Sequence, residues 1–202
     1  LHGTYVTYDW EAMLGILALE AERAGAVLVG EDLGTLEPWV QTALRDMGIL
    51  GTTIIWFEHA EEGPTPRPQD QYRRMAMSSV GTHDLPPTLA FLRGDHIALR
   101  ARLGLLTTSV AEEEEQDREW QNQVKDNLQA YGMLNNRENE EDVLVALHEY
   151  VAGTPSALTV TNVVDMVGDV RAQNQPGTTK DQYPNWCIPL CNTAGEPVLL
   201  ED

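Results

Sequence analysis

Long apolar runs, cysteines and basic residues are all scarce in this sequence. No apolar run approaches the roughly 20 residues that a membrane-spanning helix needs, so we expect no transmembrane segment. Two cysteines, Cys187 and Cys191, are too few for a disulfide framework in 202 residues. Their spacing also lacks the partner His or Cys pair of a zinc site. We therefore predict two reduced thiols in a cytoplasmic protein.

The shortage of basic residues leaves a formal net charge of −19, from 13 basic and 32 acidic side chains. Such a chain repels phosphate backbones and anionic membrane surfaces, which argues against nucleic-acid or membrane partners. A neutral ligand such as a sugar is not repelled. Two acidic runs, 112–115 and 138–142, supply part of the charge, and we interpret both as solvated helix faces or loops.

The sequence begins with Leu1, and no signal-peptide pattern follows it. We expect the chain to begin within a longer protein or after processing. Its 202 residues are enough for one domain with a core, or for part of a larger domain.

Strand and helix patterns alternate along the chain. Continuous apolar or β-branched runs predict strands at 26–29 and 53–57, and two further strands are predicted at 75–80 and 157–160. Helical periodicity predicts helices at 10–25, 35–47, 86–92, 96–103, 110–131, 142–151 and 163–167. From residue 171 onward the sequence is rich in Gly, Pro, Asn and Thr and is predicted mostly as loop. This alternation indicates an α/β fold with a parallel sheet, either half of an eight-stranded barrel or a small open sheet.

Acidic residues directly follow two of the predicted strands. Glu31 and Asp32 follow the first strand, and His83 and Asp84 follow the third. Functional groups in parallel α/β folds gather at the carboxyl ends of strands, so we expect Glu31 and Asp84 to meet across one site. In one alternative, Glu31 or Asp32 caps the following helix. In another, Glu31, Asp32 and Asp84 bind Mg²⁺ in a metal-dependent enzyme.

Four segments, in order, resemble the amylomaltases, the 4-alpha-glucanotransferases of glycoside hydrolase family 77. They are residues 3–34, 48–58 (GILGTTIIWFE), 81–88 (GTHDLPPT) and 174–186 (NQPGTTKDQYPNW). The resemblance implies a retaining α-glucan transferase on a (β/α)8 barrel. It makes this chain the second half of the TIM barrel, with a helical insertion.

In this interpretation, residues 1–202 are the C-terminal portion of a catalytic barrel. Residues 1–92 and 151–202 supply barrel elements, and residues 93–150 form the helical insertion. The outer strands of a half barrel are open edges that require partners. The implied partner is the N-terminal half of the same enzyme, and we expect self-association or a partly disordered tail when the chain is isolated.

The resemblance also implies roles, residue by residue. Glu31 matches the general acid/base in the family's GEDLG motif, and Asp84 matches the transition-state-stabilising Asp of its THD motif. His83 and Asn174 match a His and an Asn that contact the sugar, and we predict a substrate contact for Asp32 as well. The implied substrates are α-1,4-glucans and malto-oligosaccharides. The chemistry requires no cofactor and no metal.

The family's third catalytic group, an Asp nucleophile, lies in an Arg-x-Asp-His motif upstream of the region that these segments match. We therefore expect the isolated chain to be inactive, and a non-catalytic sugar-binding half-domain is the second alternative. Asp9 does not match that motif and is predicted to start a helix. Trp56 and Trp186 are candidates to stack on sugars, although we expect core positions for both.

Overall fold

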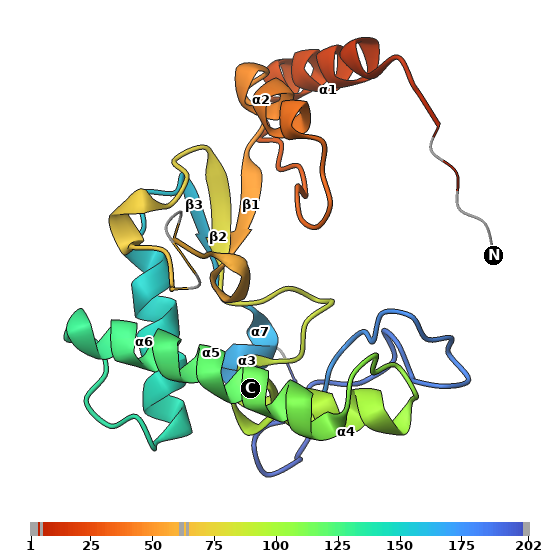
Figure 1. The fold of residues 1–202 in the computed structure, drawn as a ribbon. Coiled ribbons are helices and arrows are strands. Elements are labelled where there is room, and N and C mark those ends of the chain that lie inside the picture. The colour runs from red at the N-terminus through yellow and green to blue at the C-terminus, as the bar shows by residue number, and fades with distance from the viewer. Residues whose placement is uncertain (1–3, 5, 61–62, 64, 200–202) are drawn as a thin grey trace.

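The computed structural model describes residue 4, residues 6–60, residue 63 and residues 65–199. Helices and strands alternate along the chain, as predicted (Figure 1). The helices are α1 (Trp10–Ala24), α2 (Pro38–Asp46), α3 (Thr88–Arg93), α4 (Asp95–Arg102), α5 (Val110–Ala130), α6 (Glu140–Ala152) and α7 (Val163–Val167). The strands are β1 (Gly51–Ile54), β2 (Ala76–Ser79) and β3 (Leu158–Val160), and two short 3-10 helices are η1 (Ile55–Phe57) and η2 (Gln69–Gln71).

The three strands form one parallel sheet in the order β1-β2-β3. Gly51 is aligned with Ala76 between β1 and β2, and Met77 with Leu158 between β2 and β3. The α/β class and the parallel sheet are therefore confirmed. The connection from β2 to β3 contains α3 to α6, which gather at the end of the sheet opposite α1 and α2 (Figure 1).

The strand predicted at 26–29 is wrong in extent, because it is reduced to a single parallel bridge. Leu50 donates its N–H to the carbonyl of Leu28 and accepts from the N–H of Gly30, which pairs Val29 with Leu50. Val27 and Val29 are exposed. An apolar run forms a stable buried strand only when both faces are covered, and the described residues cover only part of this one.

Strand β1 begins and ends earlier than the predicted 53–57. Its residues are all buried, and the chain then turns through η1. The turn directs Trp56 into the core, where its ring stacks on Phe91 with the centroids 4.2 Å apart. The core position expected for Trp56 is confirmed, whereas Phe57 is exposed.

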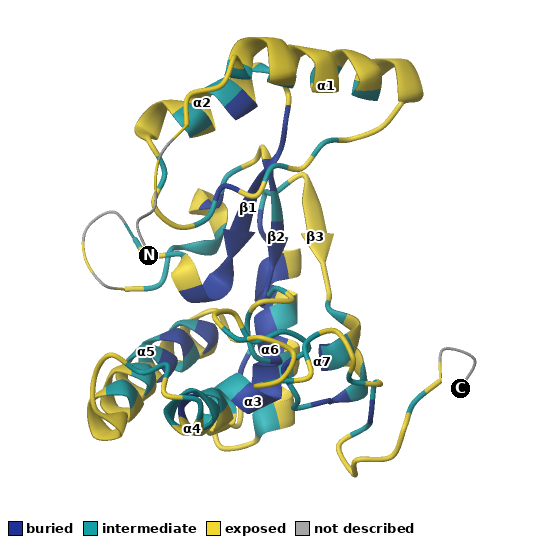
Figure 2. Cartoon of the chain, turned by 90° about the vertical axis from the view of Figure 1, so that its right-hand side faces the viewer, coloured by how far each residue is buried: buried dark blue, intermediate teal, exposed yellow. Residues whose placement is uncertain are grey.

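The hydrophobic core lies between the sheet and helices α3, α5 and α6 (Figure 2). Helix α6 presents five buried side chains at helical spacing, namely Val143, Ala146, Leu147, Tyr150 and Val151. Helix α5 adds Val124 and Leu128. The segment 93–150, predicted as an insertion, thus shares one continuous core with the sheet.

Helices α1 and α2 extend beyond the amino end of the sheet, and α1 has no buried residue (Figures 1 and 2). Asp9 caps α1 by accepting a hydrogen bond from the backbone N–H of Ala12, which confirms its predicted helix-start position. Gly25 ends α1 with φ of 62°, a conformation that glycine adopts without steric cost. The rings of Trp10 and Trp39 join α1 to α2. No helix in the described part of the chain is long and apolar enough to cross a bilayer.

The two acidic runs begin helices. Ser109 and Glu112 form a reciprocal capping box at the start of α5, and Asn139 caps α6 just before Glu140 and Glu141. Carboxylates in the first turn of a helix also interact favourably with its dipole. Both runs therefore lie at the starts of helices and are mostly exposed, in agreement with the predicted solvated helix faces or loops.

A half-buried contact between α4 and α5 contains two groups with perturbed pKa values. Asp117 Oδ1 lies 4.0 Å from His96 Nε2. Burial raises the pKa of Asp117 to about 6, partly offset by the hydrogen bond from Gln121. Burial and the nearby Arg100 lower the pKa of His96. At neutral pH the imidazole is therefore neutral, and the contact leaves a buried carboxylate without a cationic partner at His96.

Replacing Asp117 by Asn should stabilise the fold at neutral pH and leave it unchanged in mild acid. The native pKa of about 6 exceeds the ordinary 3.8, so the folded state binds the proton more tightly than the unfolded state. Stability is then lost as pH rises from about 4 to 6, by roughly 1–2 kcal/mol in total, because partial exposure to solvent screens the charge. Thermal unfolding of both proteins at pH 4 and pH 8 measures this. An equal difference at the two pH values would contradict the account.

Candidate functional site

A cavity of about 530 Å³ opens at the carboxyl end of the sheet. Residues of all three strands line it, together with residues from the segment 29–33, from the segments that follow β2 and β3, and from the tail. The polar and aromatic residues of the lining include Glu31, Thr82, His83, Asn162, Gln173 and Trp186. A ligand in this cavity would meet apolar side chains together with several hydrogen-bonding groups, as in most small-molecule sites.

Glu31 reaches the cavity because it follows the Val29–Leu50 bridge by two residues. The preceding Gly30 is fixed by a hydrogen bond from its N–H to the carbonyl of Leu50, at 2.8 Å. The Glu31 carboxylate makes no hydrogen bond or ion pair with any residue that the structure describes, and it is exposed to the cavity. A carboxylate in this setting is free to exchange a proton with a bound ligand.

His83, Asp84 and Asn174 are brought together at the same end of the sheet. The side-chain amide of Asn174 donates to Asp84 Oδ1 at 2.6 Å. His83 Nε2 lies 3.5 Å from the same oxygen. The Asp84 backbone N–H donates to Thr82 Oγ1, which fixes the turn that carries both side chains. Asp84 Oδ2 has no partner among the described residues, so it remains available to a ligand.

Asn174 is held in place by a loop that is closed on itself. The backbone N–H of Trp186 donates to the carbonyl of Gln173, at 2.8 Å. Within the loop, Asn185 accepts from the backbone N–H of Gln175 and donates to Thr178. The sequence predicted only an irregular tail here, and these bonds show how the tail is ordered around Asn174.

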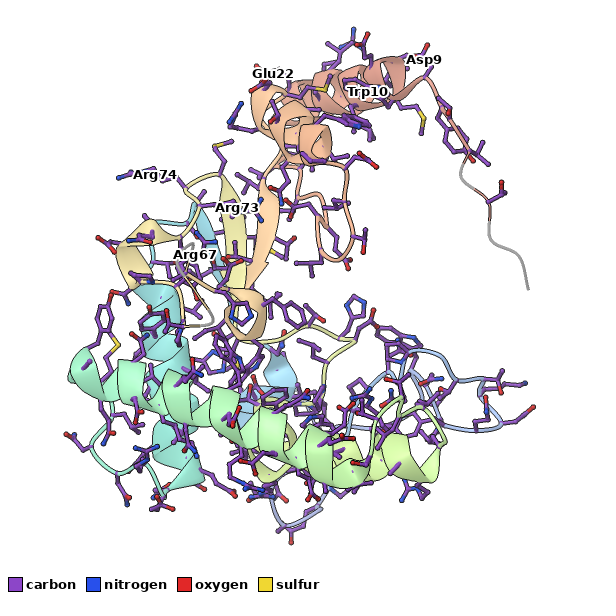
Figure 3. The ribbon with its side chains drawn as sticks, in the orientation of Figure 1. Asp9, Trp10, Glu22, Arg67, Arg73 and Arg74 are labelled. Atoms are coloured by element: carbon purple, nitrogen blue, oxygen red, sulfur yellow. The ribbon has the colours of Figure 1, made fainter. Side chains whose placement is uncertain are left out.

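Asp32 does not reach the cavity, and its predicted substrate contact is contradicted. Its side chain is 1% exposed and forms a two-armed ion pair with Arg73, at 2.6 and 3.2 Å. It also accepts from the backbone N–H of Thr52 at 2.7 Å. Figure 3 shows Arg73 beside the sheet. The helix-capping alternative is wrong as well, because Glu37 is the N-cap of α2.

This ion pair also explains Gly51 at the start of β1. A Cβ atom at Gly51 would lie 2.7 Å from Arg73 Nη1 and 2.8 Å from Asp32 Oδ2. Both distances are shorter than the contacts that a Cβ atom makes with nonbonded nitrogen or oxygen atoms in proteins. The absence of a side chain at position 51 therefore makes room for the buried pair.

Asp32→Ala should lower the free energy of unfolding by about 3 kcal/mol, since it leaves Arg73 without its partner and the Thr52 N–H without its acceptor. Chemical denaturation followed by circular dichroism measures this loss. Asp46→Ala is the matched control, because Asp46 pairs with Arg45 at the surface and should contribute little. Equal effects of the two substitutions would contradict the structural role of Asp32.

The four-residue pattern Arg-x-Asp-His does occur once in this chain, at 93–96. The structure places it at the junction of α3 and α4, where Asp95 and His96 line a different cavity of about 500 Å³. That cavity shares no lining residue with the one that contains Glu31. The match at 93–96 is therefore not positioned to act with Glu31.

The magnesium alternative required Glu31, Asp32 and Asp84 to converge on one ion. Asp32 is committed to Arg73 instead. Within the described ranges, no group of three or more His, Cys, Asp or Glu side chains is arranged to hold a metal ion.

Trp186 and Asn162 also line the cavity. The sequence named Trp186 as a candidate to stack on sugars but favoured a core position, and it did not single out Asn162. Trp186 was expected in the core, but it is 63% exposed, and its ring lies 5.2 Å from that of His83. Asn162 lies just beyond β3. The criterion that selected Glu31, a polar residue directly after a strand, would also have selected Asn162. Trp186 has no such signal, because its place depends on the folded tail.

A parallel sheet with acidic and hydrogen-bonding groups at its carboxyl end is typical of α/β enzymes. Residues 1–193 match the sequence profile of 4-alpha-glucanotransferases, glycoside hydrolase family 77, and the chain belongs to this family. The resemblance predicted from the four motifs is thereby confirmed.

Individual relatives agree with this assignment. The chain is 51% identical to the 4-alpha-glucanotransferase of Mycobacterium tuberculosis over 205 residues, which covers 99% of this chain and 28% of the relative. It is 28% identical to the Haemophilus influenzae 4-alpha-glucanotransferase, over 93% of this chain and 28% of the relative. The chain therefore spans little more than a quarter of the length of these relatives.

Two solved structures are also similar to this chain. The crystal structure of amylomaltase from Corynebacterium glutamicum matches with a TM-score of 0.92 and 54% identity, over 98% of this chain and 30% of that protein. Amylomaltase from Streptococcus agalactiae in complex with acarbose matches with a TM-score of 0.58 and 17% identity, over 91% of this chain and 31% of that one. The second match shows similarity of fold alone.

Proposed function

We propose that this chain is the C-terminal segment of a retaining 4-alpha-glucanotransferase, which moves α-1,4-glucan segments between malto-oligosaccharides. The observation that carries the proposal is one cavity at the carboxyl end of a parallel sheet, which is lined by an unpaired Glu31 and by His83, with Asp84 and Asn174 in contact beside His83. Membership of family 77 supports the choice of glucan over other neutral ligands.

In the proposed reaction, Glu31 protonates the glycosidic oxygen of the donor glucan as its bond to the anomeric carbon breaks. An Asp from the rest of the enzyme attacks that carbon and forms a glycosyl-enzyme. Retaining enzymes hold two such carboxyl groups about 5–5.5 Å apart. Glu31 then removes the proton from the 4-hydroxyl of an acceptor sugar, which attacks the same carbon and releases the Asp. The unpaired state of Glu31 suits both transfers.

Asp84 would stabilise the positive charge that develops on the sugar ring. The Asn174 amide fixes one carboxylate oxygen and leaves Oδ2 free to accept sugar hydroxyls. His83 would donate a hydrogen bond to the same ring. Asn174 thus contributes by orienting Asp84, in addition to the sugar contact that the family resemblance implies.

We further propose that the sheet is the second half of a (β/α)8 barrel, with 93–150 as its helical insertion. All three residues of β3 are exposed, as are Met13 and Ile16 on α1. The N-terminal half of the enzyme would cover these surfaces and supply the nucleophile. An isolated chain would then be inactive and would self-associate through them. The proposed compartment is the cytoplasm, in keeping with two free thiols.

Disproportionation of maltotriose tests the proposed function. The full-length enzyme should release glucose and form longer malto-oligosaccharides, and the 202-residue chain alone should not. Excess chelator should leave the rate of glucan transfer unchanged, whereas a metal-dependent enzyme would lose its activity. Transfer by the isolated chain would overturn the proposal that the nucleophile lies elsewhere.

A further inference from the structure

Trp186 has an unusual backbone conformation. It is the one non-glycine residue in the described part of the chain with a positive φ, at 61°. A bulky side chain is rarely found in this left-handed region, because its Cβ crowds the neighbouring carbonyl. Such strain persists only where the surrounding structure imposes it, and it is concentrated at ligand-binding sites.

Hydrogen bonds on both sides of Trp186 impose this conformation. Its own N–H is bonded to the carbonyl of Gln173, and the next N–H, of Cys187, donates to the carbonyl of Pro184. The side chain of Asn185 is bonded at both ends within the loop. The loop 173–186 therefore fixes the indole before any ligand arrives.

Packing does not account for the strain at Trp186. The side chain is 63% exposed, so most of its apolar surface gains nothing from burial. The conformation instead places the indole in the lining of the cavity. There it lies against the His83 ring, tilted by 45° with the ring centroids 5.2 Å apart. Through the same loop, Asn174 reaches Asp84. The indole and His83 therefore line one cavity, and Asp84 and Asn174 lie beside His83 rather than among the lining residues.

This arrangement suits the chemistry of a glucose ring. The broad faces of a pyranose carry C–H groups with a small positive charge, and an indole face is electron-rich. The edges of the sugar carry hydroxyls, which pair with groups such as His83 and Asp84. We propose that Trp186 is the platform on which one glucose unit of the glucan stacks, preset by the loop 173–186. This inference rests on the proposed function and adds a specific sugar contact to it.

Binding of maltoheptaose to the full-length enzyme, disabled by Glu31→Gln, tests the platform by calorimetry. Adding Trp186→Gly should weaken binding roughly five- to tenfold, and adding Trp186→Phe should weaken it by less than about threefold. The matched control is Trp39→Ala, which removes an exposed tryptophan that packs against Trp10 outside the cavity and should leave binding unchanged.

Thermal unfolding separates binding from folding. Glycine adopts a positive φ freely, so Trp186→Gly should unfold at or above the temperature of its parent while binding falls. Unchanged binding in the Gly variant, or equal weakening by Gly and Phe, would overturn the platform. Failure of the proposed function would be visible separately, as undiminished maltotriose transfer by the Glu31→Gln parent.

Discussion

Glu31→Gln in the full-length enzyme is expected to reduce glucan transfer by about 10²- to 10⁴-fold, the range for loss of a general acid/base. The amide cannot give a proton to the leaving oxygen or take one from the acceptor hydroxyl. It keeps the size of the side chain, and the Glu31 carboxylate has no structural partner to lose among the described residues. Folding should therefore be unaffected, and initial rates with maltotriose measure the loss directly.

A donor with a better leaving group refines this test. Fluoride departs without protonation, so the first step with α-maltosyl fluoride should be much less sensitive to Glu31→Gln than transfer from maltotriose. The control is Glu37→Gln, the same change at the exposed residue that precedes α2. Glu37→Gln should leave both rates unchanged. A Glu31→Gln enzyme with normal maltotriose transfer would refute the role of Glu31.

Asp84→Asn is expected to lower kcat by about 10²- to 10³-fold, as for other groups that stabilise transition-state charge. The substitution removes the negative charge that opposes the developing positive charge on the sugar. It preserves an oxygen that can accept from Asn174, so the loops should keep their arrangement. Because the charge matters most in the transition state, KM should change much less than kcat. Steady-state kinetics with maltotriose separates the two.

Asp95→Asn is the matched control for this substitution. Asp95 belongs to the Arg-x-Asp-His pattern at 93–96, but it lines a separate cavity between α4 and the tail. We expect near-normal transfer. A loss at Asp95 as large as that at Asp84 would mean that the nucleophile lies within this chain, contrary to the account.

Much of the helical structure was predictable because its signals are local. Asp9 and Gly25 delimit α1, and the Ser109 capping box begins α5. The strands were less predictable, because their extent depends on distant neighbours. Residues 26–29 have a strand-like sequence and only one strand neighbour in the described structure. The early end of β1 follows from the packing of Trp56 on Phe91, which no local pattern shows.

The candidate site was predictable where a residue follows a strand and a family motif agrees. Glu31, His83 and Asp84 satisfy both conditions. The substrate contact predicted for Asp32 was wrong because adjacent side chains after a strand point in opposite directions. Only the position of Arg73 shows that Asp32, and not Glu31, is the buried one. The core position expected for Trp186 was wrong because its exposure depends on how the loop 173–186 closes.

The configuration of one reaction product tests the role of Glu31 most directly. The Glu31→Ala enzyme should be incubated with α-maltosyl fluoride and azide, which fits the space left by the carboxylate. If Glu31 is the acid/base, azide attacks the glycosyl-enzyme from the face that Glu31 occupied, and the product is the α-azide. A β-azide would identify Glu31 as the nucleophile, and an absence of azide product would contradict its position beside the scissile bond.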